Sequence, residues 1–140
     1  MPNWILYALA SALFAALTAI FAKMGLKDIN SDLATAIRTG MILLITWSIV
    51  FYKGLQGNVF HLNKPTWIFL ALSAIATGLS WLFYYRAIQL GNVSQVTAID
   101  KGSIIFTILL SFIFLKEPLT GKVLAGAALV FAGMLVIIWK

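Results

Sequence analysis

Residues 4–22 read WILYALASALFAALTAIFA, an apolar run that contains no charged side chain and ends at Lys23. A helix needs about 20 such residues to cross a hydrocarbon core about 30 Å thick. The run could be mistaken for a secretion signal, but no basic residue precedes it, and it is longer than the usual core of about 7–15 apolar residues. We therefore expect a retained membrane-spanning helix.

The rest of the chain has the same apolar character. Of its 140 residues, 62% are hydrophobic and only 10% are charged, and the mean hydropathy is +1.01. Soluble domains average about 45–50% apolar and about 25% charged residues. These values exclude a water-soluble fold, a disordered chain and a disulfide scaffold, and they predict one integral membrane domain over residues 1–140.

Four further apolar runs of similar length follow the first. They are continuous and lack the period-two alternation of barrel strands, so we expect helices rather than strands. The predicted fold class is an all-α integral membrane protein with five transmembrane helices, at about 4–22, 33–52, 66–85, 93–115 and 120–139. Because the connections are short, any function must lie between the helices.

Local signals support these limits. Pro65 suits the first turn of a helix, where its missing N–H costs little. Residues 90–92, Leu-Gly-Asn, are typical of a helix C-terminus and turn. Residues 116–118, Lys-Glu-Pro, break the fourth run because proline does not continue a helix comfortably. Thr120 is the expected N-cap of the fifth helix.

We interpret the excess of positive charge as a determinant of orientation in the membrane and not as a nucleic-acid-binding surface. Ten Lys and Arg face four Asp and Glu, which gives a net charge of +6, but these charges sit singly between apolar runs. Five spans place the termini on opposite sides of the membrane. The cations on the N-terminal side are Lys53, Lys64, Lys116 and Lys122, and those on the other side are Lys23, Lys27, Arg38, Arg86 and Lys140, with Lys101 as a further member.

Four cations against five or six is a weak bias for the positive-inside rule. Insertion in both orientations and a fixed orientation set by other features both stay open.

Three charges fall inside predicted spans, where a charge normally faces a cavity or a partner. Arg38 lies roughly 7–8 Å into the second span, and it either extends to the interface or contacts an anion or carboxylate. Asp100 and Lys101 lie roughly 10–12 Å into the fourth span and about 100° apart. A carboxylate in a water-poor cavity can exchange a proton near neutral pH. Alternatively, the helix begins near residue 97 and both charges lie at the interface.

Weaker candidates for a substrate or ion pathway are polar or aromatic. Ser11 and Thr18 share one face of the first span, although such hydroxyls also bond to their own helix. Gln95 adds polarity near the start of the fourth span, and Trp81 lies deeper than the other aromatic residues.

Catalytic, metal and cofactor sites are not expected. The chain has one histidine, His61, no cysteine and four acidic residues. These provide no paired carboxylates and no His-anchored nucleophile. We therefore do not expect an enzyme.

The fifth span carries small residues that favour close helix packing. Gly126 and Gly133 share a face, and Gly121 lies nearby. The helix that they contact is either in the same subunit or in a second copy. Five helices enclose little interior, whereas an antiparallel pair of copies would reproduce the ten-helix inverted repeat of many transporters.

Several stretches together resemble a known family. They are residues 87–96 (AIQLGNVSQV), 99–103 (IDKGS) and 114–120 (FLKEPLT), followed by Gly126 and Gly133, with 21–26 (FAKMGL) and 36–39 (AIRT) upstream. The chain resembles an EamA domain of the drug/metabolite transporter superfamily, in its short five-helix bacterial and archaeal form. Most relatives have ten helices in two inverted halves, so the resemblance implies one half that works as a dimer.

The resemblance implies a secondary transporter of a small organic metabolite or drug, working by alternating access in the cytoplasmic membrane. Proton coupling is a further option, through Asp100. The implied partners are the lipid bilayer, a small-molecule substrate and a second copy of the chain, with no nucleic acid. The alternative functions are a non-transporting membrane subunit and a component of a lipid or lipid-linked flippase. Substrate, direction and coupling ion are not specified by the sequence.

Overall fold

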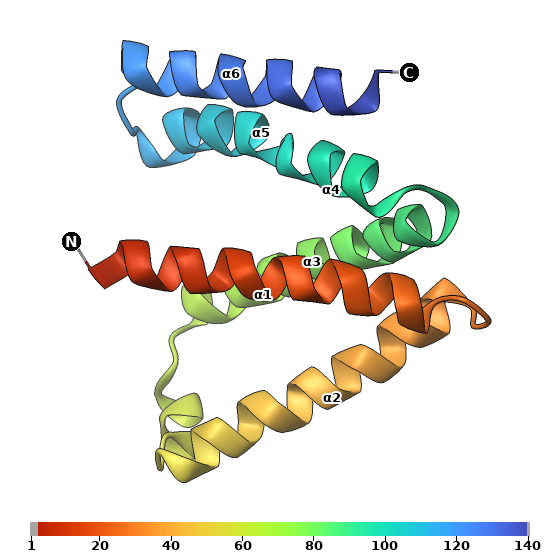
Figure 1. The fold of residues 1–140 in the computed structure, drawn as a ribbon. Helices are drawn as coiled ribbons and strands as arrows, with labels where there is room; N and C mark the ends of the chain where they lie inside the picture. The colour runs from red at the N-terminus through yellow and green to blue at the C-terminus, as the bar shows by residue number, and fades with distance from the viewer. Residues whose placement is uncertain (1–2, 140) are drawn as a thin grey trace. The chain divides into compact units, whose positions relative to one another are not determined.

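The computed structural model describes residues 3–139, so Lys140, one of the cations assigned to the C-terminal side, lies outside the described part. Within residues 3–139 the chain is helical and forms no strand (Figure 1). Five segments are long and apolar enough to cross a membrane. Few of their residues are buried in the single chain, so lipid or another protein must cover the rest.

The elements follow one another with short connections. They are α1 (Asn3–Gly25), α2 (Ser31–Tyr52), the 3₁₀ turn η1 (Gln56–His61), α3 (Lys64–Leu90), α4 (Val93–Lys101), α5 (Ser103–Leu110), the π-helical turn η2 (Ser111–Leu115) and α6 (Gly121–Ile138). Together α4, α5 and η2 make one apolar span, Val93–Leu115. The chain divides into two compact units: a central unit of residues 21–89, and a terminal unit of residues 3–20 and 90–139.

Side chains cap three of the spans at their starts. Asn30 accepts hydrogen bonds from the backbone N–H groups of Asp32 and Leu33 at the start of α2. Asn63 accepts from the backbone N–H of Thr66 at 3.0 Å, just after α3 begins. The N-cap predicted at Thr120 is confirmed, because its side chain accepts from the N–H of Val123.

One boundary differs clearly from that expected. The third helix does not end at Tyr85 but continues through Arg86 to Leu90. Arg86 is exposed and donates to the side chain of Gln89 at 3.2 Å, so its charge does not require the helix to stop. The fourth span begins at Val93, the start that the sequence predicted, with Asn92 as the N-cap residue, and not at the alternative start near residue 97. Asp100 and Lys101 therefore lie inside the helical span.

The fourth span is interrupted at Gly102, between α4 and α5. The N–H of Gly102 donates to the carbonyl of Ile99, and the N–H of Ile105 donates to the carbonyl of Gly102, an i to i+3 pattern. The span then closes with η2 and with Lys116 in the left-handed conformation, at φ 55°. The sequence predicted an uninterrupted helix here.

In the terminal unit, α4 and α5 pack against α6 (Figure 1). The closest approach involves Gly102 and Met134, since a Cβ built at Gly102 would lie 2.9 Å from the Met134 sulfur. Gly102 is buried although it follows the charged pair Asp100–Lys101 directly. Its missing side chain allows the two helices to come this close.

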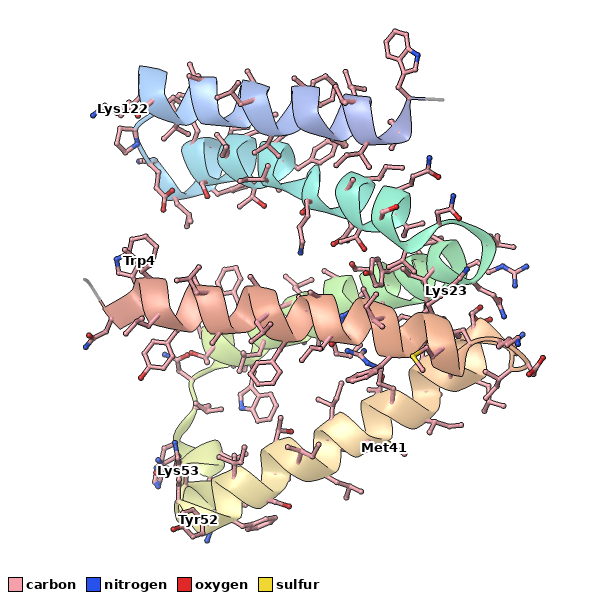
Figure 2. The ribbon with its side chains drawn as sticks, viewed as in Figure 1. Trp4, Lys23, Met41, Tyr52, Lys53 and Lys122 are labelled. Carbon is pink, nitrogen blue, oxygen red and sulfur yellow. The ribbon has the colours of Figure 1, made fainter. Side chains whose placement is uncertain are left out.

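In the central unit, polar side chains tie the end of α3 to the end of α1 and the turn that follows. Lys23, labelled in Figure 2, donates from Nζ to the carbonyl of Ile88 at 2.8 Å. Gln89 donates from Nε2 to the carbonyls of Leu26 and Ile29. Leu26 and Ile88 are fully buried beside these bonds. The last turn of α3 thus gains partners that a free helix end lacks.

Candidate functional site

Arg38 and Trp81, both singled out in the sequence, meet in the central unit. The Arg38 guanidinium carbon lies 4.6 Å from the centroid of the Trp81 ring and 5.1 Å from that of Tyr85. Trp81 and Tyr85 are one helical turn apart on α3, so their rings form one surface. This is a cation–π arrangement, in which the quadrupole of each ring attracts the positive charge.

The guanidinium does not reach back to the start of α2. At 1.5 Å per residue, Arg38 lies roughly 10 Å along α2 from Ser31. Its contacts with Trp81 and Tyr85 place the charged group beside α3, at positions five to nine residues before the end of that helix at Leu90. A side chain that extended to the interface would instead point toward the helix ends.

One nitrogen of this group has no acceptor. Arg38 Nη1 is buried and makes no hydrogen bond, and no carboxylate within residues 3–139 forms an ion pair with Arg38. Thr35, buried on the same face of α2, donates its hydroxyl proton to the carbonyl of Ser31 at 2.8 Å and accepts no hydrogen bond from Arg38 Nη1. A buried donor without a partner carries a free-energy cost, because it has lost water and gained nothing in exchange.

Asp100 and Lys101 pair with each other in the terminal unit. Lys101 Nζ lies 3.8 Å from Asp100 Oδ2, and the side chains of Lys101 and Asp100 are 61% and 40% exposed. The long lysine side chain bridges the angle of about 100° that separates adjacent helix positions. At this exposure the pair contributes little to stability. Both charges stay available to a ligand.

Lys101 also lines a hollow in the terminal unit. The hollow has a volume of about 690 Å³ and is wide open, closer to a surface groove than to an enclosed cavity. Its polar lining comes from Asn92, Ser94, Thr97 and Lys101, and its apolar lining from Ala16, Ala19, Ile20, Val93, Ala98 and Ile137. A mostly apolar wall with a few convergent polar groups is the usual composition of a small-molecule site.

Helical spacing explains the composition of this wall. Ser94, Thr97, Ala98 and Lys101 follow the i, i+3, i+4, i+7 pattern, so they share one face of α4. Asp100 lies about 100° around the helix from Lys101 and does not line the hollow. The sequence indicated that Asp100 and Lys101 point in different directions, and here only the lysine meets the hollow.

The other pathway candidates lie outside this hollow. Ser11 and Thr18 are on α1, but the residues of α1 that line it are Ala16, Ala19 and Ile20. Gln95 accepts a hydrogen bond from the side chain of Asn92 at 3.4 Å and does not line it. The structure therefore groups the candidates into Arg38 with Trp81, and Asp100 with Lys101, and leaves these three polar residues apart from both groups.

The glycines of α6 face open space in the single chain. A Cβ built at Gly121, Gly126 or Gly133 would meet no atom within 4 Å outside its own helix. Contacts within the terminal unit therefore do not account for these small residues. α6 packs on α4 through another face, which includes Met134.

Four contributors do not stand out in the sequence. Tyr85 reads only as an aromatic residue at a helix end, although its spacing of one turn from Trp81 is a usable signal. Ser94 and Thr97 read only as general polarity, although they share a face with Lys101. Gly102 gives no signal of its own, because an isolated glycine in an apolar run is common in membrane helices.

Comparisons with known proteins agree with this architecture. The EamA-like transporter family model matches residues 2–139. The chain is 45% identical over 135 residues to a protein of Sinorhizobium sp named "Uncharacterized transporter in cobO 3'region", and the match covers 96% of each chain. No solved structure matches the chain. The chain is a multi-pass membrane protein whose described residues form five spans, and it belongs to the EamA-like transporter family.

Proposed function

We propose that the chain is a secondary transporter that moves a small organic metabolite across the cytoplasmic membrane by alternating access. The observation that carries this is the hollow beside α4, where Lys101, Ser94 and Thr97 interrupt an otherwise apolar wall. A volume of about 690 Å³ suits a small organic molecule. Membership of the EamA-like transporter family supports the same conclusion. Neither observation calls for an enzyme.

The working form proposed is a dimer of two copies. Large apolar side chains remain exposed along every span of the single chain, and the face of α6 that carries Gly126 and Gly133 meets no neighbour within the terminal unit. Small residues allow helix backbones to approach closely in lipid. A second copy packed on this face would double the five spans to the ten that an alternating-access pathway commonly uses.

Proton coupling is assigned to Asp100. Its carboxylate is partly exposed, lies within a membrane span and is close to a single cation, Lys101. Protonation of Asp100 would change the charge beside the hollow, so solute binding and proton binding would influence each other. This is the coupling that a proton-driven transporter needs.

The experiment does not require the solute to be identified in advance. Purified protein is reconstituted into vesicles, ¹³C-labelled metabolite extract is added outside, with and without a pH gradient, and mass spectrometry identifies what enters. We expect wild-type vesicles to take up at least one solute that empty vesicles exclude. Ala98→Phe places a ring in the hollow and should reduce that uptake about tenfold or more.

Ile99→Phe is the matched control. Ile99 is adjacent in sequence, is 56% exposed and does not line the hollow. It should leave uptake unchanged. If wild-type vesicles take up nothing beyond empty vesicles, the chain does not transport by itself, and the role of a non-transporting subunit is favoured instead. Equal uptake by both variants would show that the hollow is not on the pathway.

A further inference from the structure

The charge balance around Arg38 is incomplete. Its guanidinium lies over Trp81 and Tyr85, within a membrane span, and no carboxylate among residues 3–139 pairs with it. Cation–π contacts attract the positive charge, but an aromatic ring provides no oxygen lone pair for the planar fork of N–H donors. The buried Nη1 therefore keeps an unused donor.

Neighbouring groups do not supply the missing acceptor. The Thr35 and Ser31 hydroxyls donate to the Ser31 carbonyl and to Asp32 Oδ1, and neither oxygen accepts a hydrogen bond from Arg38 Nη1. Tyr85 contributes its ring. An isolated charge in a water-poor setting is costly, so residues of this kind normally face a partner or a transported species. Part of the Arg38 side chain stays exposed, which leaves a ligand a route to it.

We infer that Arg38 binds an oxyanion, a carboxylate or a phosphate, that belongs to the transported solute. The inference rests on the proposed transport function and narrows its substrate to organic anions. Arginine presents paired N–H donors in the geometry of a carboxylate or phosphate edge, and such charge-assisted bonds are the strong ones. A cationic solute would meet repulsion at Arg38, and a neutral solute would leave its charge uncompensated.

The test sorts transported solutes by charge. Vesicles of phosphatidylcholine, which has no net charge, carry wild-type protein, Arg38→Gln or Arg38→Lys, and ¹³C-labelled extract is first separated by ion exchange into anionic, neutral and cationic fractions. We expect uptake by the wild type from the anionic fraction. Arg38→Gln should reduce this uptake about tenfold or more, which is the usual effect of removing a charged hydrogen bond. Arg38→Lys keeps the charge without the fork and should retain an intermediate rate.

Arg86→Gln is the matched control. Arg38 and Arg86 are the arginines of this chain, and Arg86 is exposed, is hydrogen-bonded to Gln89 and lies about 100° around α3 from Tyr85. Its replacement removes the same net charge and should leave anion uptake unchanged. Equal loss in Arg38→Gln and Arg86→Gln would overturn the inference in favour of a general charge effect. Gel filtration of each variant checks that it is folded.

The remaining outcomes separate the inference from the function on which it rests. Uptake confined to cationic or neutral solutes would keep the transporter and overturn the anion assignment. Uptake of nothing by the wild type would overturn the transport function itself. A lipid headgroup is the other source of an oxyanion. If the Arg38 effect appears only when phosphatidylglycerol is added to the vesicles, the partner is a lipid and the solute assignment is wrong.

Discussion

Gly102 and Met134 are in such close contact that a Cβ at Gly102 would lie 2.9 Å from the Met134 sulfur and 2.9 Å from the carbonyl oxygen of Ile99. The sulfur belongs to a flexible side chain and can move aside. The carbonyl oxygen is backbone and cannot move without changing the 3₁₀ turn that joins α4 to α5. A side chain at this position would therefore distort the turn between α4 and α5 and displace Met134 from its contact.

Gly102→Ala should destabilise the protein. The added methyl group overpacks the α4–α6 contact, which typically costs about 1–3 kcal/mol. Unfolding in detergent mixtures of increasing denaturing strength, followed by circular dichroism, measures the decrease in the free energy of unfolding. Gly78→Ala is the control, since a Cβ at Gly78 meets no atom within 4 Å, and alanine is the better helix former there by about 1 kcal/mol. A Gly102→Ala protein as stable as Gly78→Ala would contradict the close contact.

Lys23→Gln should also destabilise the protein, by weakening the end of α3. Lys23 Nζ donates to the carbonyl of Ile88 at 2.8 Å, and hydrogen bonds from charged donors contribute about 1.5–3 kcal/mol. The same unfolding measurement applies, with hydrogen exchange at residues 86–90 as a local readout. Lys27→Gln removes an equal charge from an exposed position in the adjacent turn and should change neither quantity. Equal effects of the two substitutions would argue against the cap.

Asp100→Asn should abolish proton-dependent uptake while leaving the protein folded. The amide keeps the shape of the carboxylate but cannot bind and release a proton as the carboxylate does. A pH gradient therefore no longer drives uptake of the solute. Uptake with and without an imposed gradient measures the effect. The gradient should accelerate the wild type and have no influence on the variant. A variant that still responds to the gradient would exclude Asp100 as the coupling group.

Gly126→Leu combined with Gly133→Leu should weaken self-association without unfolding the single chain. Both positions face open space in the single chain, so larger side chains cause no clash there, but they would hold a second backbone at a distance. Cross-linking in membranes followed by electrophoresis measures the dimer. Gly78→Leu, on α3 and also without neighbours, is the control. Unchanged cross-linking in the double variant would place the dimer contact elsewhere.

Single cysteines should report the orientation, because the natural chain contains none. Lys27 follows α1 and Asn58 lies between α2 and α3, so the two positions lie on opposite sides of the membrane. Labelling of intact cells with an impermeant thiol reagent at both positions, each in about half the molecules, indicates two orientations. This is the outcome expected for an antiparallel pair, given the weak charge bias. Labelling at only one position would require a parallel or heteromeric assembly.

The five spans could be predicted because hydropathy over about 20 residues is a strong signal. The start of α6 could be predicted at Thr120 because a threonine before a long apolar run can accept a hydrogen bond from a backbone N–H in the first turn of the helix. The end of α3 could not be predicted as well from the sequence. A charge at Arg86 suggested a boundary, but an exposed arginine bonded to Gln89 is compatible with a helix that continues to Leu90.

Tertiary relationships were beyond the sequence. The contact of Arg38 with Trp81 joins different helices, and no local pattern specifies which faces of α2 and α3 meet. The break at Gly102 lies against Met134 on α6, which is also a contact between distant segments. By contrast, the division of Asp100 and Lys101 between two faces follows from helical geometry alone.

The odd number of crossings has a consequence for how larger relatives could arise. A chain that crosses the membrane five times ends on the side opposite to its start. If a second copy were joined directly to its C-terminus, that copy would have to begin from the far side and would run through the membrane upside down relative to the first. Tandem duplication of such a gene therefore creates two inverted halves in one step, with no linking helix and no change in either half.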